Sequence, residues 1–274
     1  MSHNITLAHL NIRSLLPSFN DVAEVVLDNN YSILCISETW LRDGIDAAAL
    51  GIDNYSFVHR DRPSRGGGVA MYIKNDLKFT VLQMSYNIEQ LWALISVGQF
   101  KFAVGVAYRP QQCDRYFFIN ELENSLSEVL PQSSLLILVG DFNIHMNLYH
   151  SSHTRALTDA MAVYGLTQIV EENTRVTATS ASLVDVIFVT DRDILADSGV
   201  RDFHLSDHAL TFCTLKFTCN KQQPQMRRHM PLTQFRSNRA PAPWLTETIR
   251  VMQKHHDNAL KTFKKSSNPI HWDY

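Results

Sequence analysis

The stretch LLILVGDFN, residues 135–143, is an apolar run that leads directly into a polar pair. The run predicts a β-strand. Asp141 and Asn143 are two residues apart, so they point to the same side at the end of that strand. An Asp-x-Asn pair can carry chemistry, but it can equally close a turn by bonding its own backbone. The spacing alone therefore does not decide between the two interpretations.

Short apolar runs on either side of this stretch predict further strands. They are ITLAHLN (5–11), YSILCISE (31–38), GGGVAMYIK (66–74), LWALISV (91–97), KFAVGVAY (101–108), SLVDVIFV (182–189) and HALTFCTLKF (208–217). One helix is expected to begin after Asp114 as N-cap, and a second covers roughly 153–164 with Gly165 as its stop signal. With so few helices between strands, we expect an α/β fold of two packed, mainly antiparallel β-sheets flanked by helices.

Length and composition are those of a folded globular protein. The chain has 274 residues, 45% of them hydrophobic, which is enough for a large core. It shows neither a secretory signal at its start nor a run of about 18 apolar residues, so we expect no membrane span. The four cysteines lack CxxC or zinc-finger spacing. We interpret them as reduced thiols of an intracellular protein.

Charge is distributed unevenly along the chain. Residues 1–220 hold 15 basic and 24 acidic groups, a net charge of −9, whereas residues 221–274 hold 10 and 3, a net charge of +7. An acidic body repels a polyanion unless metal ions or local basic groups compensate. The densest basic cluster of the body is Arg60, Arg62 and Arg65. Any binding of nucleic acid must therefore rely on local features of this kind.

Composition also divides the chain into parts. Residues 1–220 are expected to form one domain, and residues 221–243, rich in Gln, Pro, Arg and Ser, read as a linker. Residues 244–274 predict a basic amphipathic helix, with apolar residues on one stripe and Arg250, Lys254, Lys261 and Lys264 on the other. Such a helix is typical of a bridge packed on a neighbouring domain, and its charge also suits direct contact with nucleic acid.

Several predicted strands end in polar residues that suit the hydrolysis of a phosphodiester. This reaction needs a base for the attacking water, stabilisation of the phosphoryl oxygens and help for the leaving oxygen. Glu38 at a strand end offers a hard oxygen ligand for Mg²⁺, and Asp207 with His208 begins another strand. Asp185 lies inside an apolar stretch, where an unpaired carboxylate is costly, so it needs a partner such as His208. Asn11 and Tyr108 complete the set; each residue taken alone would also suit an ordinary strand end or turn.

The motifs occur in an order that resembles a known family. LNIRSL (10–15), SETWL (37–41), RGGGV (65–69), AYRP (107–110), GDFN (140–143), SLVDVIF (182–188) and LSDHA (205–209) look like the exonuclease–endonuclease–phosphatase superfamily. Over about residues 5–217 the chain is similar to the apurinic-type endonuclease domain of LINE-like non-LTR retrotransposon polyproteins. The resemblance implies a four-layer α/β sandwich like that of pancreatic deoxyribonuclease. Residues 242–250, APWLTETIR, resemble the connector before the reverse transcriptase of such polyproteins.

The resemblance implies a role for each polar strand end. Glu38 would bind Mg²⁺, for which Mn²⁺ can substitute, with the help of Asn11. Asp141 would position or deprotonate the attacking water, and Asn143 would hold the phosphate and that water. His208, oriented by Asp185, would donate to a phosphoryl oxygen. Tyr108 would support the pentacovalent state. Asp207 would either serve a second metal position or orient Asn11.

Four residues are expected to contact DNA on the same basis. Ser206 would touch the phosphate backbone, and residues 174–182, TRVTATSAS, match the variable hairpin that meets the groove near the cut. Arg175 and Thr177 of that hairpin, together with Arg109 of the AYRP motif, are the remaining expected contacts.

The implied activity is Mg²⁺-dependent nicking of DNA that leaves a 3′-hydroxyl and a 5′-phosphate. In this family that hydroxyl primes reverse transcription at the target. The implied partners are double-stranded DNA, a downstream reverse transcriptase domain and, indirectly, the element RNA, with synthesis in the cytoplasm and action in the nucleus. Two alternatives stay open: a phosphodiesterase or phosphatase of the same fold that acts on RNA or lipid, and a domesticated domain that binds nucleic acid without cutting it.

Overall fold

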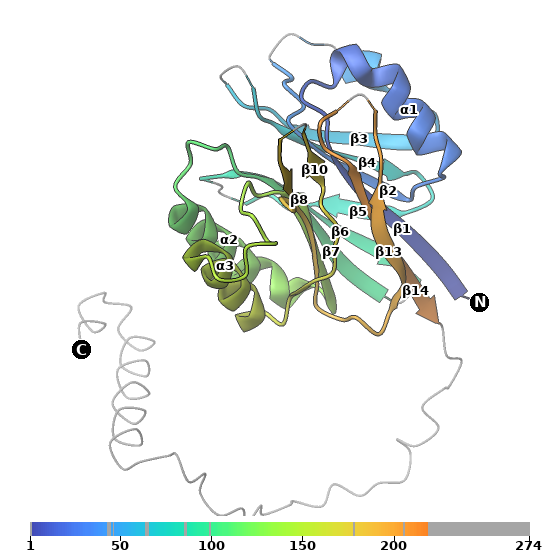
Figure 1. Ribbon diagram of the computed structural model, residues 1–274. Helices are drawn as coiled ribbons and strands as arrows, with labels where there is room; N and C mark the ends of the chain where they lie inside the picture. Colours follow the sequence, from blue (N-terminus) through green and yellow to red (C-terminus); the bar gives the residue numbers. More distant parts are fainter. Residues whose placement is uncertain are drawn as a thin grey trace, which may run out of the picture. The chain divides into compact units, whose positions relative to one another are not determined.

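Two six-stranded sheets make up the body of the protein (Figure 1). The computed structural model describes residues 2–218, except residues 43, 44, 46, 64, 65, 85, 86, 99, 178 and 205. The linker predicted at 221–243, the basic helix predicted at 244–274 and Arg65 lie outside the described residues.

The first sheet has the strand order β13-β14-β1-β2-β4-β3, and the second has the order β5-β6-β7-β8-β12-β9. The strands of the first are β1 (Ser2–Asn11), β2 (Ile33–Ser37), β3 (Tyr55–Arg60), β4 (Val69–Lys74), β13 (Leu195–Arg201) and β14 (Leu210–Thr218). Those of the second are β5 (Lys78–Val81), β6 (Glu89–Val97), β7 (Phe100–Tyr108), β8 (Leu135–Asp141), β9 (Thr167–Gln168) and β12 (Asp185–Val189). Each sheet contains one parallel pair, β1 with β2 and β7 with β8, and its other pairs are antiparallel. The predicted mainly antiparallel pairing is confirmed.

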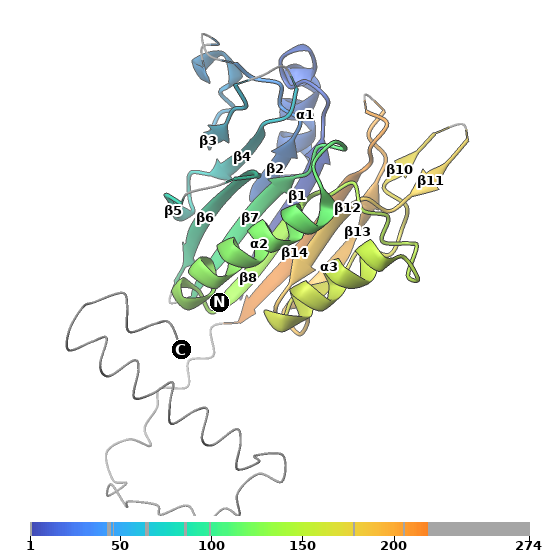
Figure 2. The ribbon, with the colours of Figure 1, turned by 90° about the vertical axis from the view of Figure 1, so that its left-hand side faces the viewer.

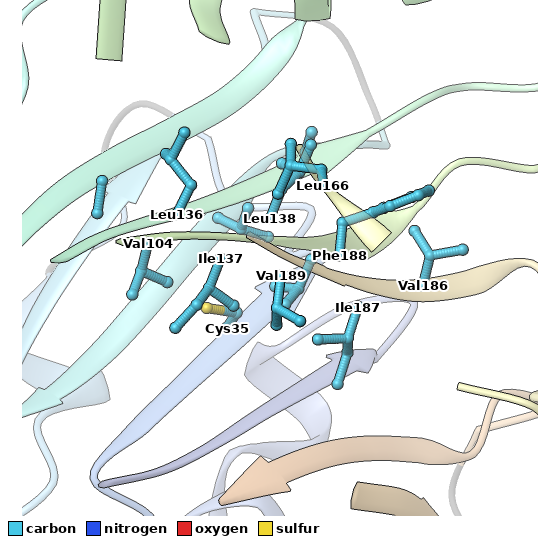
Figure 3. Close-up of a cluster of buried hydrophobic side chains, with 14 of the residues drawn as sticks. Cys35, Val104, Leu136, Ile137, Leu138, Leu166, Val186, Ile187, Phe188 and Val189 are labelled. Atoms are coloured by element: carbon cyan, nitrogen blue, oxygen red, sulfur yellow. The ribbon is translucent and has the colours of Figure 1, made fainter. Parts of the chain in front are cut away.

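The main core lies between the two sheets. Strand side chains alternate between the faces of a sheet, and Figure 3 shows Val104, Ile137 and Ile187 of the second sheet pointing toward the side where Cys35 of β2 lies. Leu136 and Leu138 point the opposite way, toward the outer face. All five strand residues are fully buried. The central strands are therefore covered on both faces, which explains why LLILV is a continuous apolar run.

Helices cover the two outer faces. α2 (Arg115–Val129) and α3 (Ser152–Val163) lie on the second sheet, and α1 (Phe19–Asp28) lies on the first (Figures 1 and 2). Asp114 is the N-cap of α2, and its side chain accepts a hydrogen bond from the backbone N–H of Phe117 at 2.9 Å. Both predicted helices are confirmed to within a residue or so. No helix in the described part of the chain is long and apolar enough to cross a bilayer.

Helix α1 and several edge strands were missed by the sequence analysis. α1 is short and buries only Val22 and Val26, and β3 and β5 are edge strands whose residues are largely half-buried. A two-stranded hairpin, β10 (Arg175–Val176) with β11 (Ala181–Ser182), projects from the body in Figure 2. Three short 3-10 turns complete the elements: Leu16–Ser18, Ala47–Leu50 and Leu130–Gln132.

The strand register brings the polar strand ends to one edge of the sandwich. Tyr108 of β7 pairs with Asp141 of β8, and Asp141 pairs in turn with Asp185 of β12. Gly140 lets these strands approach, because its φ is 150° and a Cβ there would lie 1.8 Å from the carbonyl oxygen of Ala107. The glycine of the GDFN motif is therefore a steric requirement.

Candidate active site

Asn11 links carboxylates that belong to different sheets. Its buried Nδ2 atom donates to Oε1 of Glu38 and to Oδ2 of Asp141, each at 2.9 Å. Glu38 follows β2 with a φ of 56°, a conformation that is uncommon for residues other than glycine. Its Oε2 accepts a hydrogen bond from Nε1 of Trp40 at 3.1 Å, and the Tyr108 hydroxyl also bonds this carboxylate. These donors fix the Glu38 carboxylate, which is half-buried, in one orientation.

Asp141 is the buried carboxylate at the centre of the site, with an exposure of 1%. Its Oδ1 accepts a hydrogen bond from the backbone N–H of Asn143 at 2.9 Å. Burial, together with the charge of Asp185, raises the pKa of Asp141 to about 7, although His208 and the hydrogen-bond donors act in the opposite direction. A carboxylate whose pKa lies near neutrality is well suited to accept a proton.

Asp185 and His208 form a hydrogen-bonded pair beside Asp141. Nδ1 of His208 lies 2.8 Å from Oδ2 of Asp185, and both side chains are buried. Burial lowers the pKa of His208, but the charge and hydrogen bond of Asp185, followed by Asp141 and Asp207, outweigh it and raise the pKa to about 9. The imidazole is therefore protonated at neutral pH, and its Nε2 is left to act on a ligand. The contact that the sequence analysis expected between these two residues is present.

These groups surround a cavity of about 230 Å³. Its lining brings together six of the predicted site residues with four that were not predicted: Arg13, Glu38, Trp40, Tyr108, Gln111, Gln112, Asp141, Asn143, Arg175 and His208. Residues that are far apart in the chain thus meet at a single opening at one edge of the sandwich.

Arg109, which was predicted to contact DNA, is buried and bonded to backbone carbonyl oxygens. Its side chain is 1% exposed, and Nε donates to the carbonyl oxygen of Phe142 at 2.6 Å. Nη2 donates to the carbonyl oxygen of Asn143 at 2.8 Å, and Nη1 bonds the carbonyl oxygens of Pro110, Gln111 and Cys113. The guanidinium donates to carbonyl oxygens inside the protein and in this way holds the backbone that carries Asn143. Asn143 has a φ of 48°, and its Nδ2 returns a hydrogen bond to the carbonyl oxygen of Arg109 at 2.9 Å.

Ser206, which was predicted to touch the phosphate backbone, bonds two groups of the protein. Its hydroxyl donates to the carbonyl oxygen of Asn11 at 2.7 Å and accepts from the backbone N–H of His208 at 3.1 Å. A serine hydroxyl has a single proton, so the side chain is not available as a donor to a phosphate. It ties the segment that carries His208 to the end of β1.

Asp207 contacts two arginines. Nε and Nη2 of Arg175 lie 2.9 Å and 2.8 Å from its Oδ2, and Nη1 of Arg13 lies 3.4 Å from its Oδ1. Asn11, which Asp207 was expected to orient, is instead held by Glu38 and Asp141. The expected metal role of Asp207 therefore competes with its use as an anion for two guanidinium groups.

The predicted hairpin contacts stand at the edge of the site. Thr177 is exposed, and its Oγ1 accepts a hydrogen bond from the backbone N–H of Ser180 at 3.1 Å, which closes the turn of the hairpin.

Arg60 and Arg62 of the basic cluster line a separate cavity of about 350 Å³ that Tyr108 also borders. Nη1 of Arg62 lies 3.5 Å from Oε1 of Glu89, so this part of the cluster is partly neutralised.

Two sets of groups could hold a metal ion. The ligand atoms of Asp141, Asp185 and His208 all lie within 4.8 Å of one another, so these three groups fit a metal site geometrically. Glu38 with Asn11 offers a second set, made of hard oxygen atoms of the kind that Mg²⁺ prefers. The protonation of His208 distinguishes the two sets. A protonated His208 that is bonded through Nδ1 to Asp185 has no lone pair for a metal.

Several residues of the site were missed by the sequence analysis, among them Gln111 and Gln112 of the cavity lining. Trp40 bonds Glu38, Arg13 lines the cavity, and the buried His9 lies beside Asp185. His9 is the one polar residue within the apolar run LAHL, which is a signal that could have been followed. Trp40 and Arg13 follow the ends of β2 and β1, and their positive φ values of 55° and 48° could not be read from the sequence.

Comparison with known proteins identifies relatives of the whole body. The model of the Endonuclease/Exonuclease/phosphatase family matches residues 8–208, and no curated protein matches the chain. An AP endonuclease from Leishmania major superimposes with a TM-score of 0.68 at 15% identity, over 78% of this chain and 88% of that one. The endonuclease domain of TRAS1, a telomere-specific non-LTR retrotransposon, gives 0.62 at 16% identity over 77% and 98%. The 3′ phosphatase NExo from Neisseria, bound to a product DNA hairpin, gives 0.60 at 18% over 76% and 98%. These likenesses show the fold, a sandwich of two sheets with outer helices.

Proposed function

This chain belongs to the Endonuclease/Exonuclease/phosphatase family, and from that premise we propose that it is a divalent-metal-dependent endonuclease that nicks double-stranded DNA. Enzymes of this family generally hydrolyse phosphodiesters and depend on divalent metals. One observation carries the proposal: Asp141, with a pKa near neutrality, lies between a fixed metal-type carboxylate, Glu38, and a protonated imidazole, His208. A base, a cation site and an acid are the three groups that phosphodiester hydrolysis requires.

The residues can be assigned to the steps of an in-line displacement. Asp141 accepts a proton from a water molecule while that water attacks the phosphorus, and Asn143 holds the water. Nε2 of His208 donates to a non-bridging oxygen, where negative charge increases in the transition state. Tyr108, whose pKa is raised by burial and by Glu38, stays protonated and keeps its hydrogen bond to Glu38. The bond from phosphorus to O3′ breaks, and O3′ takes up a proton from solvent water, to which Asp141 returns the proton that it accepted; the products are a 3′-hydroxyl and a 5′-phosphate.

Glu38 and Asn11 are the residues that we propose to hold the cation, with Mg²⁺ as the ion. The Glu38 carboxylate lines the cavity, and Oδ1 of Asn11 keeps a lone pair beyond the one that the backbone N–H of Arg13 occupies at 3.2 Å. A bound divalent cation would polarise the phosphate and offset the charge that develops on the leaving oxygen. Fixing Glu38 through Asn11, Trp40 and Tyr108 keeps its oxygens oriented toward that position.

The 3′-hydroxyl product would serve as a primer for reverse transcription by a domain of the same polyprotein. Two observations support this context: the likeness to the TRAS1 endonuclease domain, and the resemblance of residues 242–250 to the connector before a reverse transcriptase. In this proposal the element RNA is the template, and the site of action is the nucleus.

The test is to incubate the full chain with supercoiled plasmid and Mg²⁺ and to quantify open circles. We expect nicking that stops on chelation, and we expect DNA ligase to reseal the nicks, because ligase needs a 3′-hydroxyl beside a 5′-phosphate. Asp141→Ala and His208→Ala should abolish nicking, whereas Arg192→Ala, which removes an exposed charge in the loop after β12, should not. Single-stranded RNA and phospholipid are assayed in parallel. Absence of open circles, or hydrolysis only of RNA or lipid, would overturn the proposal.

A further inference from the structure

Arg13 and Arg175 both line the catalytic cavity and come from segments that are far apart in the chain. Arg13 follows β1, and Arg175 begins β10 in the projecting hairpin. Both line the cavity, and their side chains are 54% and 30% exposed, in contrast to the buried Asp141 and His208. Two permanent cations therefore stand at the rim of a cavity in a body whose net charge is −9.

The backbone holds both arginines close to the catalytic groups. The N–H of Arg13 donates to Oδ1 of Asn11 at 3.2 Å. Arg175 forms an isolated antiparallel bridge with His208, and the N–H of Ala209 donates to the carbonyl oxygen of Thr174 at 2.7 Å. The bases of both side chains are thus positioned by residues of the active site.

Asp207 joins the two guanidinium groups. Its Oδ2 receives two N–H groups of Arg175, and its Oδ1 receives one from Arg13. Each guanidinium has five N–H donors, and within the described part of the chain their other donors carry no hydrogen bond. Two arginines on a single carboxylate leave a net positive charge and several donors that face the cavity mouth, which is the arrangement that recognises a phosphate.

We propose that Arg13 and Arg175, held together by Asp207, form a phosphate clamp. The clamp binds a backbone phosphate of the DNA next to the phosphate that is cut, which reaches deeper between Glu38, Asp141 and His208. Asp207 is then the anchor of the clamp and not a metal ligand. The inference rests on the proposed function, since it assigns the substrate contact that an acidic body needs.

The first test measures binding without cleavage. A DNA duplex is titrated into the full chain in the presence of chelator at a series of salt concentrations. Arg13→Ala and Arg175→Ala should each weaken binding several-fold and reduce the slope of log K against log salt by about one. Arg192→Ala, which removes the same charge at the far end of β12, is the matched control and should leave the slope unchanged. Wild-type affinity and slope in both clamp variants would overturn the proposal.

Asp207→Asn separates an anchor from a metal ligand. The substitution makes the protein less negative, so charge alone would tighten DNA binding. If Asp207 anchors the clamp, KM for DNA rises instead, while the Mg²⁺ concentration for half-maximal nicking stays the same. A raised Mg²⁺ requirement with unchanged KM would identify a metal ligand and overturn the anchor. Failure of nicking would contradict the proposed function. The DNA titration in the presence of chelator would still show whether the clamp binds a phosphate.

A separate observation concerns His9, on the other side of Asp185 from His208. His9 is fully buried, and its Nε2 lies 3.1 Å from Oγ of Ser37. Its Nδ1 lies 3.8 Å from Oδ1 of Asp185, and within the described residues these two buried atoms have no hydrogen-bond partner. In its neutral form the buried ring carries one N–H. Buried polar atoms that face each other in this way are normally paired.

We infer that His9 is a positioning residue whose Nδ1–H is directed at Oδ1 of Asp185. With Nε2 accepting from Ser37, the one proton of the ring faces Oδ1 of Asp185, while Oδ2 stays on His208. Asp185 would then be held between two imidazoles, and its orientation toward His208 would depend on both.

Paired substitutions test this role. Asn at position 9 places a donor near the position of Nδ1, and Gln places one near Nε2. We expect His9→Gln to lower kcat strongly at unchanged KM for DNA, and His9→Asn to recover a large part of that loss, with similar melting temperatures for both variants. Equal losses in the two variants, or losses that follow the melting temperature, would show that His9 only fills space.

Discussion

Buried and exposed parts of the same site use charged side chains in different ways. The buried group, Asp141, Asp185 and His208, is at most 3% exposed, and the pKa values of Asp141 and His208 depart far from their ordinary ones. The rim group, Arg13, Asp207 and Arg175, has side chains 25% to 54% exposed. Interactions between charges are strong where water is excluded and weak where it is present. We therefore expect the cleavage rate to depend strongly on the buried group. Each residue of the rim group should make a small contribution to the affinity for DNA.

The largest effect is expected at Asp141. Asp141→Asn keeps the shape of the side chain but removes the base, and general-base catalysis contributes about 10²–10⁴-fold to a rate. We expect the nicking rate to fall by about that factor, while affinity for DNA in chelator does not fall. Single-turnover kinetics and a binding titration measure the two quantities. A loss of less than tenfold would mean that another group acts as the base.

Next in size is the response to metal at Glu38. Glu38→Gln retains a hydrogen-bonding side chain but removes the charge that we assign to the cation site, so we expect the Mg²⁺ concentration for half-maximal nicking to rise by at least about tenfold. Asp185→Asn is the matched comparison, because it lies in the other candidate metal group. If only Asp185→Asn changes the Mg²⁺ requirement, the metal belongs to the Asp141, Asp185 and His208 group instead.

Substitution of Arg109 should change the stability of the protein and not its affinity for DNA. Arg109→Ala leaves several buried carbonyl oxygens without donors, including that of Phe142, and each orphaned group costs about 1–3 kcal/mol. We expect a fall in the free energy of unfolding of at least about 2 kcal/mol, with an unchanged salt slope for DNA binding in the protein that remains folded. Urea unfolding measures the first quantity. A changed slope with full stability would restore Arg109 as a DNA contact.

The pH profile should show both titrations of the buried group. Asp141 must lose its proton to act, so activity rises as pH passes about 7, and His208 must keep its proton, so activity falls as pH passes about 9. Asp185→Asn removes the charge that raises the pKa of His208, so the alkaline limb should move to lower pH. The measurement is kcat/KM against pH for both proteins. An alkaline limb that stays in place would show that Asp185 does not set the charge of His208.

The smallest effect is expected at the tip of the hairpin. Thr177 is exposed and its hydroxyl is engaged in closing the turn, so Thr177→Ala should change DNA affinity by no more than about twofold, against a several-fold effect at Arg175. A duplex titration compares the two variants. A larger loss at Thr177 than at Arg175 would place the main DNA contact at the tip of the hairpin and would contradict the proposed clamp.

Much of the fold could be predicted because strands buried on both faces leave a local signal. LLILVGDFN and YSILCISE are continuous apolar runs, and the structure contains β8 and β2 there. α2 was predicted from its N-cap, Asp114, and from an apolar face. The edge strands β3 and β5 were not, since partial exposure weakens the apolar pattern on which such predictions depend.

Residue types at the strand ends predicted which side chains gather at the site, but not what each one does there. Arg109 and Ser206 look like exposed DNA contacts in sequence, yet the first is occupied by backbone carbonyl oxygens and the second by Asn11 and His208. Whether a polar side chain faces a ligand or the interior depends on the neighbours that packing supplies, and those neighbours are not adjacent in the chain.

The sequence by itself determined the two-sheet architecture, the family and the list of polar strand ends, because apolar periodicity and short motifs are properties of consecutive residues. Only the tertiary structure decided that Asn11 bonds Asp141, 130 positions away, and that Asp207 bonds Arg13, 194 positions away. It also decided burial, which moves the pKa of Asp141 to about 7 while the rim arginines stay exposed. Distances and local dielectric depend on which strands lie side by side, and strand register across two sheets is fixed by packing of the whole chain.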